Sequence, residues 1–114
     1  MDASEVLDLC AAACVANSDV LLANRLDTSI DSVRSDAATT RRVVGLQAAT
    51  ANTGYFVGRL DGKPIITLDM GLANGLDQVI PLDIPIPVGQ ELSIHAHSTS
   101  GTAIATVAVH IARE

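Results

Sequence analysis

Residues 55–68 read YFVGRLDGKPIITL, and this stretch decides the fold class. An Asp-Gly pair, Asp61-Gly62, separates two apolar runs that contain aromatic and β-branched residues. Asp-Gly favours a two-residue type I′ turn, because both central residues of that turn adopt positive φ. The stretch therefore predicts a β-hairpin that joins a strand over 55–60 to a strand over 64–68.

The same pattern of short strands extends over most of the chain. From residue 19 onward, β-branched runs are bounded by turn residues about every eight to twelve positions, a spacing typical of all-β sandwiches and barrels. The polar segment 27–38 is expected to be an exposed loop. Further turns are expected at Gly71, Asn74 and Gly75 and at 87–90. Prolines lack an amide donor, so Pro81, Pro85 and Pro87 place their segment at a sheet edge or in a bend. The expected strands are 20–26, 40–49, 54–60, 79–84 and a final hairpin within 91–112.

The amino-terminal residues follow a different pattern. Asp2 and Glu5 have the spacing of a capping box at a helix start. Asn17 can end a helix in a left-handed conformation. Four apolar residues between them recur at helical spacing, namely Val6, Leu9, Cys10 and Ala13. The chain is therefore interpreted as one domain, 1–114, in which a short α-helical segment at 1–17 precedes an all-β, antiparallel β-sandwich at 19–114.

The final hairpin has a predicted register. Pairing residues whose numbers sum to about 199 puts the apolar residues of both strands on one face. This register assigns His95 and His97 to the opposite face, toward solvent or an interface. The apolar face would consist of Leu92, Ile94, Ala96, Ala103, Ala105, Val107 and Val109.

Charge and hydropathy exclude several classes of partner. The formal net charge is −6, and no basic cluster is longer than Arg41-Arg42, so binding to nucleic acid is not expected. The apolar stretch 6–16 is interrupted by Asp8 and is shorter than the ~20 residues of a membrane-spanning helix. The amino terminus is acidic, whereas a signal peptide would be basic. Neither a membrane span nor a signal peptide is expected.

His95 and His97 are the strongest candidates for metal chemistry. Two histidines at i and i+2 of a strand share a face, as metal ligands must. With Gly89, they form the pattern G-x5-H-x-H, which resembles the opening of the first metal motif of cupins. The glutamate that follows in that motif is missing here, and His110 lies in the same predicted hairpin. We therefore expect no metal ion, and a degenerate cupin-like metal enzyme using His95 and His97 is kept as an alternative function.

Other site signatures are absent from the sequence. There is no G-x-S-x-G nucleophile elbow, so the chain is not expected to be an enzyme, and no catalytic or cofactor-binding residue is assigned. Cys10 and Cys14 are expected to be small apolar residues on the helix rather than a disulfide or metal site. Carbohydrate modules stack sugars on exposed aromatic rings, and the chain has no Trp and a single Tyr. A carbohydrate or surface-binding β-sandwich module remains the first alternative.

Four stretches carry a resemblance to a known group of proteins: RRVVGLQAAT (41–50), GYFVGRLDGKPII (54–66), IPIPVGQELSI (84–94) and HAHSTSGTAIATVAVHI (95–111). Together they resemble the small β-sandwich or single jelly-roll proteins of virus and phage particles. The resemblance implies a structural virion protein made in the host cytoplasm, as a capsid, cement, decoration or spike component. It also implies a homo-oligomer that contacts other capsid proteins, with the amino-terminal helix or the 27–38 loop reaching neighbouring subunits.

Overall fold

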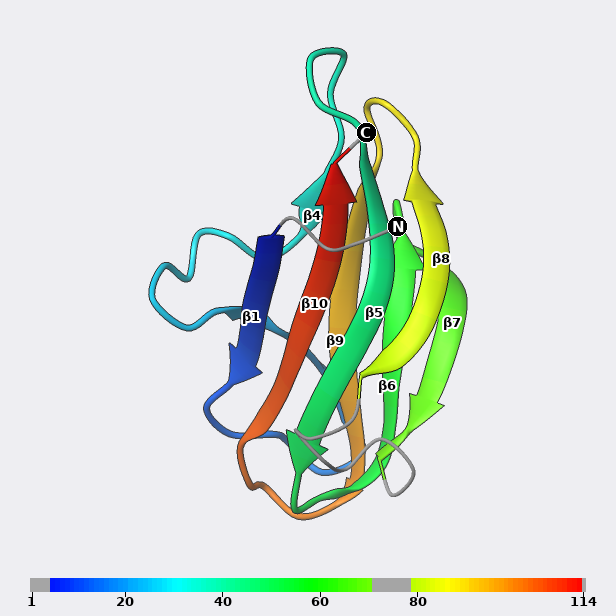
Figure 1. The fold of residues 1–114 in the computed structure, drawn as a ribbon. Helices are drawn as coiled ribbons and strands as arrows, with labels where there is room; N and C mark the ends of the chain where they lie inside the picture. The colour runs from blue at the N-terminus through cyan, green and yellow to red at the C-terminus, as the bar shows by residue number, and fades with distance from the viewer. Residues whose placement is uncertain (1–4, 71–78, 114) are drawn as a thin grey trace.

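The computed structural model describes residues 5–70 and 79–113, and they form two antiparallel β-sheets that face each other (Figure 1). Sheet A has the strand order β3-β1-β10-β5-β8, and sheet B has the order β2-β9-β6-β7 with β4 also paired to β9. The expected antiparallel β-sandwich is therefore confirmed. The strands are β1 (Glu5–Ala11), β2 (Ser18–Leu21), β3 (Ala23–Asn24), β4 (Val33–Arg34), β5 (Arg41–Thr50), β6 (Thr53–Leu60), β7 (Lys63–Asp69), β8 (Ile80–Ile86), β9 (Glu91–Ser100) and β10 (Ala105–Arg113).

The strand pairings are nested around one turn. β6 pairs with β7, β5 with β8, β2 with β9, and β1 with β10, so each pair encloses the one before it. At the centre of this nest, Asp61 and Gly62 both have positive φ, at 50° and 82°. The predicted Asp-Gly hairpin is confirmed, and it is the point at which the chain folds back on itself.

The core lies between the two sheets and follows the two-residue period of the strands. Along β9, Leu92, Ile94 and Ala96 are buried, and the residues between them are partly exposed. Along β10, the same alternation buries Ala105 and Val107. The buried residues of both sheets form one cluster between them.

The predicted amino-terminal helix is wrong, because residues 5–11 form strand β1 at the side of sheet A (Figure 1). Leu9 and Ala11 point into the core and Val6 points out, which is a period of two rather than 3.6. Asn17 does adopt a positive φ of 60°, but it lies in the turn that leads into β2. Asp2, the other half of the expected capping box, lies outside the described residues.

The segment expected as one strand over 20–26 is divided between the two sheets. β2 pairs with β9 in sheet B, and β3 pairs with β1 in sheet A. Leu22, between them, is fully buried where the chain crosses from one sheet to the other. Residues 27–38 are largely exposed, as expected, and the short strand β4 interrupts them. The loop predicted at Gly71, Asn74 and Gly75 lies outside the described residues.

The predicted pairing of the final hairpin is wrong, whereas its predicted faces are confirmed. β9 pairs with β6 in sheet B and β10 pairs with β5 in sheet A, so the two strands face each other across the core. Two strands that share a core must both turn their apolar residues toward it, and the prediction of faces therefore survives the change of partner. The proline-rich strand β8 lies at the edge of sheet A, as expected.

Candidate functional site

The polar side chains gather in two places that are candidates for function. The first is the outer face of sheet B, which we name the histidine face and define by Asp19, Tyr55, Arg59, His95 and His97. The second is a cleft beside β1, which we name the β1 cleft and which is lined by residues 5–7 and 29–34 together with Arg41 and Ile111. The two sites involve different strands and are described in turn.

Asp19 is the centre of the histidine face. Its carboxylate accepts a hydrogen bond from His97 Nδ1 at 2.6 Å and another from Arg59 Nη2 at 2.9 Å. Because a carboxylate only accepts, Nδ1 of His97 carries the proton of this hydrogen bond. The His97 ring stacks on Tyr55, with ring centroids 4.8 Å apart and planes at 18°. Strands β2, β6 and β9 are thus tied together on this face.

His95 lies two residues before His97 on β9, and its side chain is partly buried. Ser93 Oγ lies 3.1 Å from His95 Nε2. Burial lowers the pKa of His95, and the nearby Arg59 guanidinium lowers it further. His95 is therefore predominantly neutral at pH 7 and offers a hydrogen-bonding nitrogen rather than a positive charge.

His95 and His97 share a face, as their spacing predicts, and that face is the outside of the sandwich. The inward positions of the same strand are filled by Leu92, Ile94 and Ala96. Among residues 5–70 and 79–113, no three His, Cys, Asp or Glu side chains gather where they would hold a metal ion. The histidine face offers hydrogen-bond donors and acceptors to a ligand on its surface.

The β1 cleft has a volume of about 440 Å³ and opens on the side of the sandwich between β1 and the 29–34 segment. Leu7, Val33 and Ile111 contribute apolar side chains, and Val33 and Ile111 belong to the buried core. Polar or charged residues make up as much of the lining as apolar ones, so the cleft offers both kinds of contact to a side chain or a small ligand.

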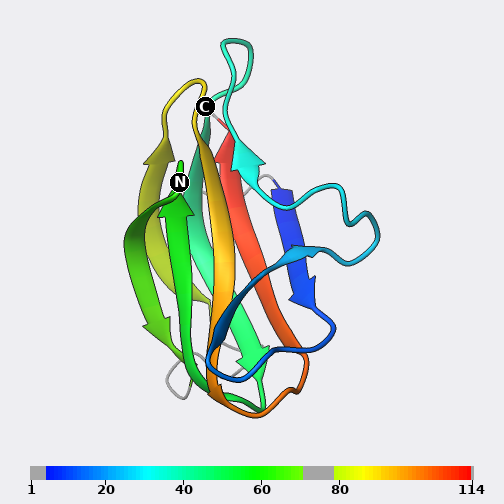
Figure 2. The same cartoon turned by 180° about the vertical axis from the view of Figure 1, so that it is seen from behind.

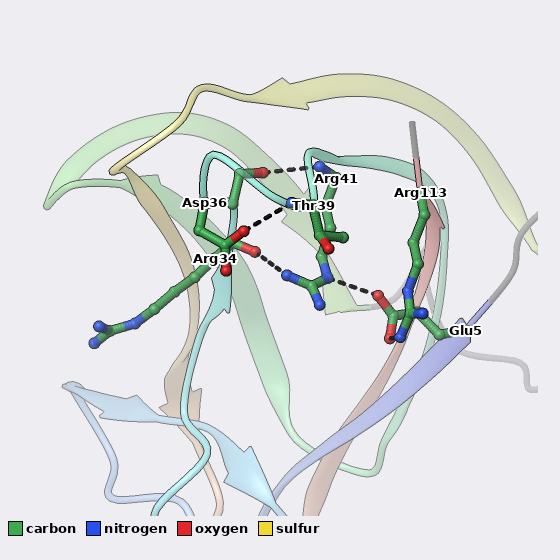
Figure 3. Close-up of polar contacts among 7 residues, drawn as sticks. Glu5, Arg34, Asp36, Thr39, Arg41 and Arg113 are labelled. Carbon is green, nitrogen blue, oxygen red and sulfur yellow. Dashed lines mark hydrogen bonds and ion pairs between the residues drawn. The ribbon is translucent and has the colours of Figure 1, made fainter.

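A small ion-pair network closes one end of the β1 cleft. Arg41 Nε donates to Glu5 Oε1 at 2.7 Å, and Arg113 Nη2 donates to Glu5 Oε2 at 3.2 Å. Arg41 Nη1 also donates to the backbone oxygen of Arg34 at 2.6 Å, whereas the Arg34 side chain extends away from this group (Figure 3). Burial tends to raise the pKa of Glu5, but the two arginines hold it below its ordinary value. Glu5 therefore stays ionised at neutral pH.

The sequence indicated only part of these sites. It singled out His95 and His97 and their common face, but not their contacts with Asp19 and Tyr55. Arg41 and Arg42 form a short basic cluster in the sequence. In the structure, Arg41 forms an ion pair with Glu5, and Arg42 forms one with Asp83 on β8. Glu5 and Arg41 are 36 residues apart, so no local spacing signals their contact.

Acid should weaken the contact between β2 and β9. The hydrogen bond from His97 is the largest cause that lowers the pKa of Asp19. A carboxylate with a lowered folded-state pKa stabilises the fold above its unfolded pKa of about 3.9, and this contribution is lost as the pH falls through the folded value. The effect is on the order of 0.5 kcal/mol, because the Asp19 side chain is 38% exposed.

Urea unfolding between pH 2 and pH 7 measures this contribution (about the range in which carboxylates titrate). We expect Asp19→Asn to show a smaller loss of stability in acid than the parent protein. His97→Ala should reproduce much of that change, because it removes the largest cause. If all three proteins lose the same stability in acid, the contribution assigned to Asp19 and His97 is contradicted.

The described residues include no helix with the length and apolarity needed to cross a bilayer. No protein-family model, no curated protein and no solved structure matches the chain.

Proposed function

We propose that this protein is a structural virion subunit that acts through contacts with copies of itself and with other capsid proteins. In this proposal the chain is built as a single jelly roll and resides in the virus particle, as a capsid, cement, decoration or spike component. It performs no catalysis. Its function is to present rigid faces and edges to neighbouring subunits.

The order of strand pairing is the observation that carries the proposal. Taking β1, β2, β5, β6, β7, β8, β9 and β10 as the main strands, the first pairs with the last, the second with the seventh, the third with the sixth, and the fourth with the fifth. This nested order, divided between two facing sheets, is that of a rolled-up hairpin. Jelly rolls of this kind occur in viral capsid proteins, lectin domains and cupins.

The outer face of sheet A is suited to packing against another subunit. Cys10, Thr106 and Ala49 form one row across β1, β10 and β5, and in the next row Ala108 lies between Asp8 and Gln47. The small side chains among these lose little conformational entropy when they are covered. A stable contact needs at least ~1,000 Å² of total buried area, which a flat sheet face can supply.

Sedimentation equilibrium over a range of protein concentrations tests the proposal. We expect the protein to associate, and we expect Ala108→Arg, which places a long charged side chain in the middle of the sheet A face, to weaken association by at least about tenfold. The matched control is Thr67→Arg, an exposed position on β7 in the other sheet. Peptides of the chain should also be found in purified virus particles from its source. A protein that stays monomeric at all concentrations and is absent from particles would refute the proposal.

A carbohydrate or surface-binding module is the second candidate, and the histidine face favours it. Tyr55 remains 38% exposed beside His97, Asp19 and Arg59, which together offer a ring edge, donors and acceptors to a hydroxyl-rich ligand. Binding to immobilised glycans that is lost in Tyr55→Ala would favour this candidate. The nested strand order also fits the cupin-like alternative, but the site disfavours it, because His95 and His97 face away from the interior.

A further inference from the structure

We propose that the free edge of β1, together with the β1 cleft, binds an extended peptide segment of a partner protein that carries an apolar side chain next to a basic one. Strand β3 pairs with β1 only at Leu9 and Cys10. The chain then leaves the sheet, and the loop that follows extends to the side of β1 (Figures 1 and 2). Residues 5–7 of β1 are paired with β10 on one side only within the described chain.

The backbone groups on this edge point toward the missing neighbour. Arg25 N–H donates to the Asp8 carbonyl at 3.3 Å, so the Asp8 carbonyl points away from β10. In an antiparallel strand, every second residue directs its N–H and C=O to the same side. Val6 therefore also points its N–H and C=O away from β10, and no described residue pairs with them. An unpaired N–H and C=O on a strand edge is the group that recognises an extended backbone.

The cleft lies next to these groups and offers a place for a side chain. Val6 and Leu7 form one wall, and the 29–34 segment forms the other. Two large apolar side chains of its lining are unusually exposed, Val6 at 57% and Ile30 at 41%. An extended segment directs alternate side chains to opposite sides, so a strand added to β1 would send one apolar side chain into the cleft.

The charges in the cleft define the second feature of the partner. Arg41 is engaged by Glu5, and Arg34 is engaged by Glu91 at 2.6 Å. Asp31 also lines the cleft, and no described residue forms an ion pair with it. The net charge of the whole chain is −6. A lysine or arginine on the added strand would pair with Asp31, whereas an acidic residue would be repelled. This docking edge would operate whether or not the protein is a virion subunit.

Titration of the ¹⁵N-labelled full chain with capped heptapeptides tests the proposal. The peptides alternate valine and threonine, and a single lysine is moved through all seven positions. We expect at least one peptide to shift the backbone amide signals of residues 5–8 and 29–34. The same peptides with glutamate in place of lysine should bind more weakly.

Two substitutions test the two halves of the site. Val6→Pro removes the outward N–H but leaves the pairing with β10, because proline is tolerated on an edge strand where its nitrogen faces solvent. We expect this variant to weaken binding about tenfold, whereas Val6→Thr, which keeps the N–H, should not. Asp31→Asn should weaken binding about threefold. The control Asp83→Asn removes the same charge from β8 at the far edge of sheet A and should leave binding unchanged.

If Val6→Pro fails to fold, a peptide that is N-methylated at every second residue tests the same hydrogen bonds from the partner's side, and it should lose binding. Several results would overturn the proposal: no amide shifts with any peptide up to roughly 1 mM, shifts confined to the histidine face, or equal binding of the lysine and glutamate series. Shifts of residues 5–8 that appear on concentrating the protein alone would assign the edge to a second copy of this chain and would also overturn it.

Discussion

Replacing Gly54 with alanine should prevent the protein from folding stably. Gly54 has φ +135° at an irregularity between β6 and β9, and a Cβ built there would lie 2.1 Å from the carbonyl oxygen of His97 and 3.0 Å from the amide nitrogen of Thr99. Both are backbone atoms of the neighbouring strand, so no side-chain rotation relieves the overlap. We expect a loss of more than about 4 kcal/mol, which is a large part of the stability of a small domain.

Gly89→Ala is the matched control. Gly89 also has a positive φ, of +83°, but a Cβ there would meet nothing within 4 Å. Its substitution therefore has only the conformational cost of a left-handed residue, about 1–2 kcal/mol. Circular dichroism and urea unfolding of the two variants separate the two costs. If Gly54→Ala is no less stable than Gly89→Ala, the close approach of β6 to β9 is wrong.

Replacing Asn52 with alanine should cause the second largest loss of stability. Asn52 is only 7% exposed, its Nδ2 donates to Thr50 Oγ1 at 3.1 Å and to Ala103 O at 2.8 Å, and its Oδ1 accepts from Ala103 N at 3.0 Å. These bonds hold the corner between β5 and β6 against the connection that carries the chain from β9 to β10. Alanine would leave a buried donor and acceptor with fewer partners, at about 1–3 kcal/mol for each group. We expect a total loss of about 3 kcal/mol.

The midpoint of urea unfolding measures this loss, and Asn24→Ala provides the control. The Asn24 side chain accepts hydrogen bonds from the amides of Leu26 and Asp27 in an exposed turn. Its removal should cost less than about 1 kcal/mol, because water replaces those bonds. Equal losses for the two variants would show that Asn52 contributes no more than a surface turn residue.

The parts of the fold that depend on local chemistry were predictable from the sequence. The Asp61-Gly62 turn fixes its own geometry through two positive φ values, and the alternation of Leu92, Ile94 and Ala96 identifies a core face wherever the strand lies. Which two strands pair with each other, in contrast, does not follow from local chemistry. β9 and β10 are close in sequence, yet each pairs with a distant strand (Leu92 lies opposite Leu60, 32 residues away, and Val107 opposite Ala48, 59 residues away), so adjacency in the chain gave the wrong pairing.

The error at the amino terminus has a similar cause. In β1, Leu7, Leu9 and Ala11 follow the strand period, while Val6, Leu9 and Cys10 also fit a helical stripe, because apolar residues occupy both faces. A short apolar run fits either period, and only the hydrogen bonds from β10 decide between them. The β1 cleft could not be predicted from the sequence for the same reason, because Glu5 contacts Arg41 and Arg113 only after the sheet has formed.

The nested pairing also determines when this chain is able to fold during its synthesis. β9 lies between β6 and the β2 and β4 strands, and β10 lies between β1 and β5, so the two central strands follow all the other described strands in the sequence. Until residues 91–113 have left the ribosome, β2 and β4 lack the strand they pair with, β1 can pair only with the two residues of β3, and the apolar faces of the sheets stay uncovered. Among the described strands, the β6–β7, β5–β8 and β1–β3 pairs are available earlier. Neither sheet can therefore close before residues 91–113 have emerged, and shorter nascent chains of this protein are expected to depend on chaperones.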